Sequence, residues 1–451
     1  MNSFFGTDGV RGEAGTVLTP QLAFNLGFCA AYVLKKYAPN DKENALVIGR
    51  DTRISGSMLE SALAAGICAA GVDVYSAGVI PTPAVAVLTR KKSALAGVVI
   101  SASHNPFGDN GIKFFNAEGR KLADKIEDEI VECMDKMADL SQAAGASIGQ
   151  IYPYAGAEEI YCEFVKEKTS ARFDGLKVVI DCANGASSTV APEILRALGA
   201  DLTVIHNTPD GVNINKACGS THPESLQAKV LELKADVGLA YDGDADRLQA
   251  VDANGRLIDG DQLLAIFALY LEAGEMLKNH TVVATVMSNM GLEKSLAPFG
   301  ITTEKSKVGD RYVVEMMEEK GAVLGGEQSG HIVFWDYNTT GDGILSSVKL
   351  LEIIALSKRS LADLADVMEK YPQVLINVPV KNKENWEKNI QITLTIKKLA
   401  DKLGDQGRIL VRASGTENLL RVMVEGKDER LIQEIAERIA AAINESINGA
   451  S

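Results

Sequence analysis

Residues 177–188, KVVIDCANGASS, show the pattern that decides the fold of this chain. A short apolar run rich in β-branched residues is followed at once by a loop of small and polar residues, and then by a helical pattern. The same order recurs at ALVIGRDTRISG (45–56), GVVISASHNP (97–106), VGLAYDGDADR (237–247), TVVATVMSNMGL (281–292) and AVLGGEQSGH (322–331). Apolar strands that alternate with helices indicate parallel sheets covered on both faces. Since ligands gather at the carboxyl ends of such strands, these loops are the first candidates for a functional site.

The last part of the chain has a different pattern. Three strands are expected there, at 374–380, 408–412 and 419–425. Two helices are expected between and after them, at 384–403 and 428–444. Less distinct domain boundaries are expected near 141–149 and 254–261. Together with these boundaries, the pattern predicts three doubly wound α/β domains and a C-terminal α+β domain. The predicted domains are 1–150, 151–255, 256–370 and 371–451.

Length, composition and charge narrow the class of protein. The 451 residues are 46% hydrophobic and 24% charged, which is ordinary for a soluble globular protein. The net charge of -14 argues against nucleic acid as a partner. The first residues, MNSFFGTDGVRG, have no basic region and no long apolar core, so we expect no secretory signal. We also expect no membrane segment, because no apolar run approaches the ~20 residues of a spanning helix. Six scattered cysteines without a CxxC pair predict free thiols in a reducing cytoplasm.

The loop YDGDADR, residues 241–247, is a candidate metal site. Asp242, Asp244 and Asp246 alternate with small residues, so an extended loop would point all three carboxylates to one side. Carboxylates crowded in this way suit a hard cation such as magnesium. An EF-hand is excluded, because Arg247 and Ala253 stand where that loop needs glycine and glutamate. The alternative is a solvated acidic turn.

The loop SASHNP, residues 101–106, offers a candidate nucleophile. Ser103 lies where an apolar strand ends, and Lys113 follows on a second short apolar run. A serine hydroxyl needs a base or a reactive phosphoryl donor before it acts as a nucleophile. The alternative is a turn serine that bonds its own backbone.

Three further loops contain groups that bind anions or hydroxyls. Ser414, Gly415 and Thr416 lie between Arg412 and Arg421, an arrangement typical of a phosphate site but also compatible with an ordinary turn. The other two loops give weaker signals. They contribute Glu327, Ser329 and His331 near a strand end, and Thr7 and Arg11 near the start of the chain.

In this order, FGTDGVRG, SASHNP, DGDADR, GEQSGH and RASGTENLLRVMVEG resemble the motifs of the α-D-phosphohexomutases over essentially the whole chain. The resemblance implies four domains around a central cleft, each contributing a loop. It implies that Ser103 is phosphorylated and that it binds one Mg²⁺ per subunit together with Asp242, Asp244 and Asp246. It also implies a cytoplasmic enzyme that uses a sugar phosphate and is compatible with a homodimer.

The remaining site residues take their roles from the same resemblance. Glu327 and Ser329 correspond to residues that hold sugar hydroxyls. The positions that bind the non-reacting phosphate are Arg412, Ser414, Gly415, Thr416 and Arg421. The positions around the reacting phosphate are Arg11, His104, Lys113 and Arg247, of which Lys113 is expected to transfer the proton.

Gln328 and the loops CGSTHPE (218–224) and VGDRYV (308–313) favour the branch that acts on glucosamine phosphates. The resemblance implies interconversion of glucosamine 6-phosphate and glucosamine 1-phosphate through a 1,6-bisphosphate, with glucosamine or glucose 1,6-bisphosphate as intermediate or activator. Such a reaction feeds UDP-N-acetylglucosamine and cell-wall synthesis. Two alternatives remain at this point: a mutase for mannose or glucose phosphates, and a sugar-phosphate sensor without catalysis.

Overall fold

The computed structural model describes residues 5–6, 9–37, 39, 41–414 and 418–449. They form two compact units. The first contains the residues up to Met287 and Phe299–Val367, and the second contains Ser288–Pro298 and the residues from Met368 onward.

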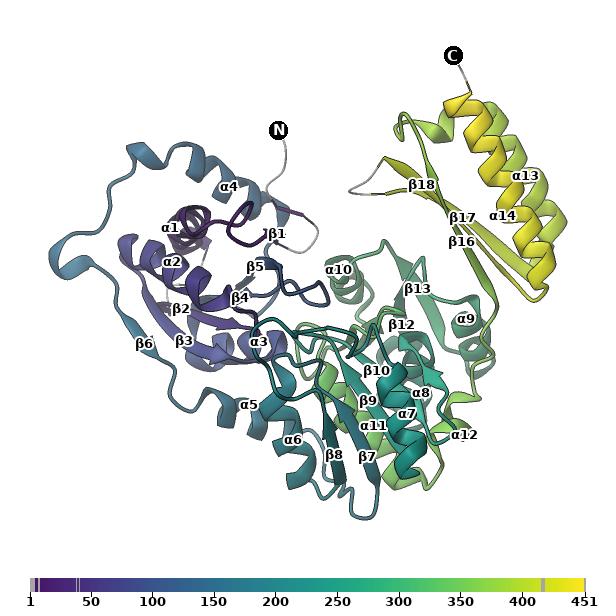
Figure 1. The fold of residues 1–451 in the computed structure, drawn as a ribbon, viewed down its shortest axis with the longest axis horizontal. Helices are drawn as coiled ribbons and strands as arrows, with labels where there is room; N and C mark the ends of the chain where they lie inside the picture. The colour runs from purple at the N-terminus through teal and green to yellow at the C-terminus, as the bar shows by residue number, and fades with distance from the viewer. Residues whose placement is uncertain (1–4, 7–8, 38, 40, 415–417, 450–451) are drawn as a thin grey trace. The chain divides into compact units, whose positions relative to one another are not determined.

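The first sheet has six strands in the order β1-β5-β4-β2-β3-β6 (Figure 1). Its strands are β1 (Val10–Glu13), β2 (Glu43–Arg50), β3 (Asp73–Val79), β4 (Ala94–Ile100), β5 (Asp109–Asn116) and β6 (Ile151–Pro153). Its helices are α1 (Pro20–Tyr37), α2 (Gly56–Ala69), α3 (Thr82–Lys92) and α4 (Asp124–Asp135). Because β6 pairs with β3, this sheet extends beyond residue 150, where the sequence pattern placed the end of the first domain.

Side chains along β2 point alternately to the two faces of this sheet, and different helices cover these two faces. Leu46 and Ile48 belong to the apolar core that also contains residues of α1, α2 and α4. Gly49 points to the opposite face, where a Cβ atom would lie 2.5 Å from Val85 of α3. Glycine at this position therefore allows α3 to pack closely on the second face.

The second sheet has the order β11-β10-β9-β7-β8. Its strands are β7 (Lys177–Asp181), β8 (Asp201–Ile205), β9 (Val237–Tyr241), β10 (Leu248–Asp252) and β11 (Leu257–Ile258). The helices in this part of the chain are α5 (Ala157–Lys166), α6 (Ser187–Ala197) and α7 (Glu224–Leu233).

The third sheet has the order β13-β12-β14-β15. Its strands are β12 (Thr281–Thr285), β13 (Thr302–Ser306), β14 (Leu324–Gly326) and β15 (Ile332–Phe334). The helices that accompany it are α8 (Gly260–Ala273), α10 (Asp310–Lys320), α11 (Gly343–Ser357) and α12 (Leu361–Ala365). Helix α11 also packs against the second sheet, where Ser347 Oγ lies 2.8 Å from Tyr241 Oη.

The connections after β4, β9 and β14 differ from the recurring pattern of strand, loop and helix. Around Lys113 a short strand was expected after the loop, but no strand was expected after the other two loops; in all three cases the chain turns back into an antiparallel strand, β5, β10 or β15. Antiparallel neighbours can be joined directly, whereas parallel neighbours need a crossover connection. The three sheets are therefore mixed rather than purely parallel, and each of these loops is held between two paired strands.

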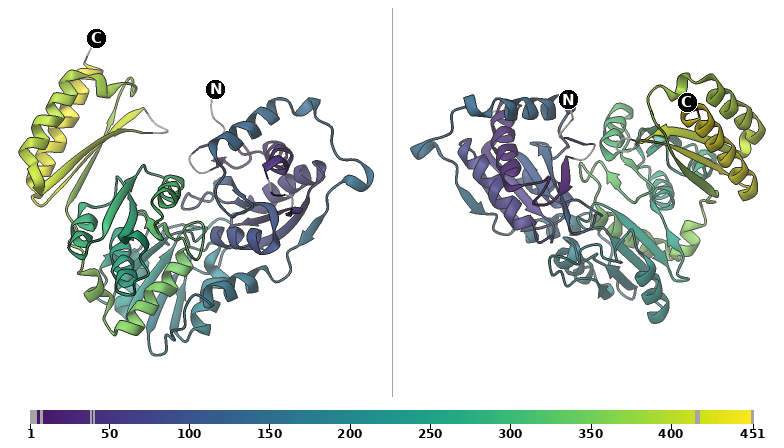
Figure 2. Two further views of the ribbon diagram at one scale, coloured as in Figure 1. Left: turned by 180° about the vertical axis from the view of Figure 1, so that it is seen from behind. Right: turned by 45° about the horizontal axis from the view of Figure 1, so that its top comes forward.

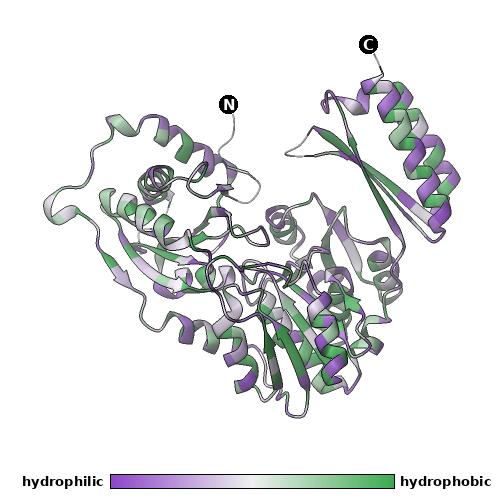
Figure 3. Cartoon of the chain, in the orientation of Figure 1, coloured by the Kyte–Doolittle hydropathy of each residue, from purple (hydrophilic) through white to green (hydrophobic). Residues whose placement is uncertain are grey.

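The second unit contains the α+β arrangement expected for the end of the chain. Its antiparallel sheet has the order β16-β18-β17, with β16 (Gln373–Pro379), β17 (Gly407–Ala413) and β18 (Leu419–Gly426). Its helices are α9 (Met290–Leu296), α13 (Ile390–Leu403) and α14 (Glu429–Ile443). Helices α13 and α14 lie on one face of this sheet in both views (Figures 1 and 2). Both helices have a hydrophilic and a hydrophobic stripe, and the apolar stripe lies in the core (Figure 3).

All six cysteines are buried free thiols, and for Cys29, Cys68 and Cys133 the apolar helical pattern around them predicted this. In the part of the chain that the structure describes, no helix combines the length and the apolar character needed to span a lipid bilayer.

Candidate active site

Three loops meet in the first unit, and each follows the carboxyl end of a sheet strand. Ser103 follows β4, Asp242 to Asp246 follow β9, and Glu327 follows β14. The loops are also linked to one another, because Ser103 Oγ donates to Asp242 Oδ2 and the backbone at Arg247 pairs with that at His331. The sequence-predicted nucleophile and acidic cluster therefore belong to one site.

Ser103 is held in an unusual backbone conformation. Its φ of 51° lies in the left-handed region, and the residue is 1% exposed. Its backbone N–H donates to Ser101 Oγ at 2.9 Å. The Ser103 hydroxyl donates to Asp242 Oδ2 at 2.6 Å, so the candidate nucleophile contacts the acidic cluster directly.

The three aspartates form a buried cluster with room for a cation. Asp242, Asp244 and Asp246 each offer a carboxylate oxygen within 4.8 Å of the other two. Burial, together with the charges of Asp246 and Asp244, raises the pKa of Asp242 well above its usual range. Asp244 Oδ1 and Asp246 Oδ1 are buried and make no hydrogen bond with the described residues. An all-oxygen set with unsatisfied acceptors fits Mg²⁺.

Cationic side chains surround this cluster. Lys113, on β5, donates from Nζ to Asp244 Oδ2 at 2.9 Å, and both side chains are nearly fully buried. Arg247 Nε lies 3.8 Å from oxygens of Asp242 and of Asp246. Burial alone would lower the pKa of Arg247, but these two carboxylates raise it above its usual value, so the guanidinium stays charged.

Of two further residues of this site, Thr82 was missing from the sequence-based set, and His331 was recognised on its glycine-rich loop but given no role of its own. His331 Nδ1 lies 3.4 Å from Asp246 Oδ2. Burial would lower the pKa of His331, but Asp246 raises it to about 9. Thr82, at the start of α3, donates to Asp244 Oδ2 at 2.7 Å. The GEQSGH motif contained a signal for His331, whereas nothing around Thr82 pointed to the site.

His104 is an uncharged neighbour of Ser103. Burial, followed by the charges of Arg247 and Arg11, lowers the pKa of His104 to about 4. Its Nδ1 lies 3.0 Å from Arg247 Nη1 and 3.3 Å from Ser103 Oγ. Since a guanidinium only donates, Nδ1 accepts a hydrogen bond and the ring proton is on Nε2. Arg11, on β1, lies close enough to contribute to this electrostatic environment.

Glu327 and Ser329 lie on the loop between β14 and β15. Gly309 N donates to Glu327 Oε1 at 3.0 Å, which connects the VGDRYV loop to this side chain. Ser329 Oγ is buried and makes no hydrogen bond with the described residues. A buried hydroxyl without a partner is a group that a ligand can satisfy.

The second unit contains a pair of arginines suited to an anion. Arg412 on β17 is directly opposite Arg421 on β18. Burial, and then the charge of Arg421, lowers the pKa of Arg412. Like charges placed opposite each other are unfavourable without a counter-charge, and a phosphate supplies one. Ser414 is buried beside them, and its carbonyl accepts from Lys383 Nζ at 2.7 Å.

Three predicted site residues, Thr7, Gly415 and Thr416, lie outside the described residues.

Models of one family match almost the whole chain. The matches are to phosphoglucomutase/phosphomannomutase alpha/beta/alpha domain I over residues 2–140, domain II over 159–255, domain III over 259–371 and the C-terminal domain over 375–442.

Curated relatives match along their full length. A phosphoglucosamine mutase from Desulforamulus reducens is 52% identical over 444 residues, which cover 98% of this chain and 99% of the relative. A phosphoglucosamine mutase from Ruminiclostridium cellulolyticum is 54% identical over 449 residues, with coverage of 98% and 99%.

Solved structures have the same fold. A phosphoglucomutase/phosphomannomutase family protein from Burkholderia thailandensis superposes with a TM-score of 0.83 at 25% identity, covering 99% of this chain and 98% of that one. An N-acetylphosphoglucosamine mutase from Aspergillus fumigatus, in complex with GlcNAc-6P and magnesium, gives a TM-score of 0.70 at 18% identity, covering 98% and 95%.

The curated relatives share about one half of their residues with this chain along its whole length. Their family is also the one expected from the acidic cluster beside Ser103 and from the paired arginines. The chain therefore belongs to the phosphoglucomutase/phosphomannomutase family of α-D-phosphohexomutases, and within it to the phosphoglucosamine mutases.

Proposed function

We propose that this phosphohexomutase converts glucosamine 6-phosphate and glucosamine 1-phosphate into each other through a phosphorylated Ser103. The main support is the 2.6 Å contact between Ser103 Oγ and Asp242 inside a buried cluster of three carboxylates. A serine in this position has cationic groups close to any phosphoryl group that it carries.

Asp242, Asp244 and Asp246 would hold one Mg²⁺, together with an oxygen of the group on Ser103. Asp244 Oδ1 and Asp246 Oδ1 are buried and accept no hydrogen bond from the described residues, which supports this assignment. When bound, such an ion offsets the negative charge of the phosphoryl oxygens.

In the first half of the reaction, a sugar hydroxyl attacks the phosphorus on Ser103. The bond from the serine oxygen to phosphorus breaks, a bond from the sugar oxygen to phosphorus forms, the departing serine oxygen takes up a proton, and the product is a 1,6-bisphosphate. Arg247 stabilises charge during this transfer, because its guanidinium stays protonated beside Asp242 and Asp246. We assign the sugar hydroxyl proton to Lys113 rather than to His104, whose low pKa makes it a weak base. Lys113 accepts this proton as the neutral amine, so the ammonium that pairs with Asp244 in the resting enzyme first gives up a proton.

The second half returns the other phosphate to Ser103. The bisphosphate reverses its orientation, and Ser103 Oγ loses its proton as it forms a bond to the second phosphorus. The bond between that phosphorus and the sugar oxygen breaks, and the sugar oxygen takes up a proton. Glu327 and Ser329 are assigned to the sugar hydroxyls during both halves. The non-reacting phosphate is assigned to Arg412, Ser414 and Arg421, with Gly415 and Thr416 of the same motif, and Thr7 and Arg11 are assigned to anion contacts around the reacting phosphate.

The test combines intact mass with turnover. The purified chain is expected to show a phosphate adduct that disappears in Ser103→Ala, and this variant should lose isomerisation even with glucose 1,6-bisphosphate supplied. Wild-type turnover by Ser103→Ala would reject the phosphoserine role. Substrate choice is tested with a panel of glucosamine, glucose and mannose 6-phosphates, in which glucosamine 6-phosphate should have the highest kcat/KM.

A further inference from the structure

Two backbone carbonyls of the Ser103 loop are each bound from two directions. The carbonyl oxygens of Ser103 and Asn105 accept from Arg53 Nη2 at 2.9 and 2.8 Å. The same two oxygens accept from Asn215 Nδ2 at 2.8 and 3.1 Å. Arg53 precedes α2 beside the first sheet, and Asn215 lies between β8 and α7 beside the second. Parts of the chain that are far apart in sequence therefore converge on the loop of the nucleophile.

Arg53 is committed entirely to this loop and its support. It is 2% exposed, and its Nε donates to Asp51 Oδ2 at 2.9 Å. The other guanidinium nitrogen, Nη1, donates to the carbonyls of Pro106 and Asp109. Asp51 in turn accepts from Ser101 Oγ, which receives the backbone N–H of Ser103. Asp51 balances the charge of Arg53, and the guanidinium nitrogens donate to groups inside the protein. Arg53 therefore has a structural role in the interior and none at the surface.

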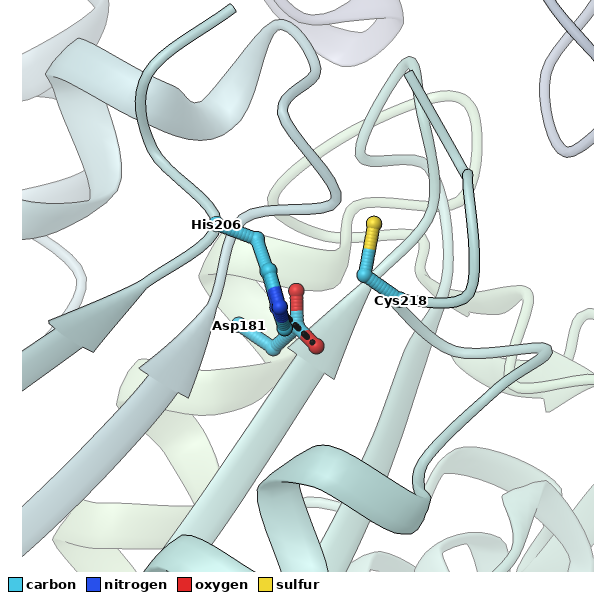
Figure 4. Close-up of side chains that lie close together, drawn as sticks. All are labelled: Asp181, His206 and Cys218. Carbon is cyan, nitrogen blue, oxygen red and sulfur yellow. Dashed lines mark ion pairs between the residues drawn. The ribbon is translucent and has the colours of Figure 1, made fainter. Parts of the chain in front are cut away.

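Asn215 is anchored just as firmly. Its φ of 58° is left-handed, and its backbone N–H donates to Ala183 O at 2.9 Å. Asp181, at the end of β7, organises the surrounding loops, since it accepts from the backbone of Ala183 at 2.8 Å and of Gly219 at 2.9 Å. Asp181 also pairs with His206 Nδ1 at 3.0 Å, next to Cys218 (Figure 4).

Asn215 also lies against the acidic loop. A Cβ atom on Gly243, between Asp242 and Asp244, would lie 2.6 Å from Ser103 O and 2.9 Å from Asn215 Nδ2. Glycine is therefore needed at this position for the acidic loop, the serine loop and the amide to approach one another. The contact between Ser103 and Asp242 depends on this three-way packing.

We propose that Arg53 and Asn215 act together as a clamp that holds Ser103 in its left-handed conformation with Oγ directed at the acidic cluster. Neither side chain needs to touch the sugar. Both are positioning residues, which set the rate of phosphoryl transfer to and from Ser103 without contributing to substrate binding. This inference rests on the proposed function.

The experiment compares Arg53→Lys, Asn215→Ala and the double variant with the wild type. Each single variant is expected to lose about 10- to 100-fold in kcat, because small displacements of a reacting group are costly. The KM for glucosamine 6-phosphate should change less than threefold. Since both side chains hold the same two carbonyls, the double variant should lose much less than the product of the single losses. Transfer of phosphate to Ser103 from glucose 1,6-bisphosphate, followed by intact mass, should slow by the same factor.

Asn338→Ala is the matched control. Asn338 is also a buried asparagine that joins two domains, since it accepts from Arg90 and donates to Asp342, but it contacts neither the serine loop nor the acidic cluster. Its kcat should stay within twofold of wild type even if its melting temperature falls. If Asn215→Ala does not fold, Asn215→Ser and Arg53→Lys are measured in its place.

Three results would overturn the clamp: kcat within threefold of wild type in folded variants, losses matched by Asn338→Ala, or losses that appear mainly in KM. These results are distinct from failure of the proposed function, which would appear as a wild-type chain without turnover or a Ser103→Ala variant that retains it.

Discussion

Replacing Lys113 with methionine tests whether the acidic cluster is a desolvated, charge-balanced site. Methionine keeps much of the apolar stem but removes the ammonium group that lies 2.9 Å from Asp244 Oδ2. The Lys113 and Asp244 side chains are 2% and 1% exposed, so water does not replace the lost partner. Among the cations described above, Arg247 then remains as the positive charge beside Asp242 and Asp246.

The size of the effect follows from this geometry. At 2.9 Å and an effective dielectric constant of ~20, the Coulomb attraction is about 6 kcal/mol. Part of this is offset by the free energy of removing both groups from water. Breaking one partner of a buried pair therefore costs about 3–5 kcal/mol in the free energy of unfolding.

Urea unfolding with and without Mg²⁺ measures this loss. Without the metal, Lys113→Met should lose the full amount at an unchanged m-value. With Mg²⁺ the loss should shrink, because the more negative cluster of the variant binds the ion more tightly and binding stabilises the folded state. The control is Lys136→Met, whose partner Glu132 lies 3.9 Å away with both side chains 70% exposed, and no measurable change is expected there. A loss below about 1 kcal/mol, or the same loss with and without Mg²⁺, would refute the reasoning.

Three further predictions follow from other parts of the structure. Burial raises the pKa of Glu127 from 4.5 to about 7, so as pH rises the unfolded state loses this proton before the folded state does. Between these two pH values Glu127 should therefore lower the free energy of unfolding progressively, by at most about 1.4 kcal/mol per pH unit. Glu127→Gln should flatten that part of the stability curve, whereas Asp128→Asn at an exposed neighbouring position should not. Arg412→Ala should raise the KM for glucosamine 6-phosphate about 10- to 100-fold, as expected for a lost charged hydrogen bond, while relief of repulsion with Arg421 should leave its melting temperature unchanged or higher. The buried cysteines should react with a thiol reagent only slowly in the native protein, and all six should react in denaturant; rapid native labelling would contradict their burial.

Much of the site could be predicted from the sequence because its chemistry is concentrated in short loops. Asp242, Asp244 and Asp246 alternate within one loop, so their shared direction follows from local backbone geometry alone. The position of Ser103 also follows from local sequence, because its hydroxyl comes directly after an apolar strand. The α/β architecture of the first three domains was predictable for a similar reason, since hydrophobic periodicity is a local property of each segment.

The antiparallel returns after β4, β9 and β14 were not predictable, because the apolar runs of β5, β10 and β15 are compatible with parallel or antiparallel pairing until a neighbouring strand is present. The same reason explains why His331 received no role of its own from the sequence and why Asn215 was missing from the predicted set. Their roles depend on contacts with Asp246 and with the carbonyl of Ser103, which are 85 and 112 positions away in the chain. Local sequence therefore determined which reactive groups this protein has, and only the tertiary structure decided which of them face one another, because sequence spacing contains no information about contacts made across separate sheets.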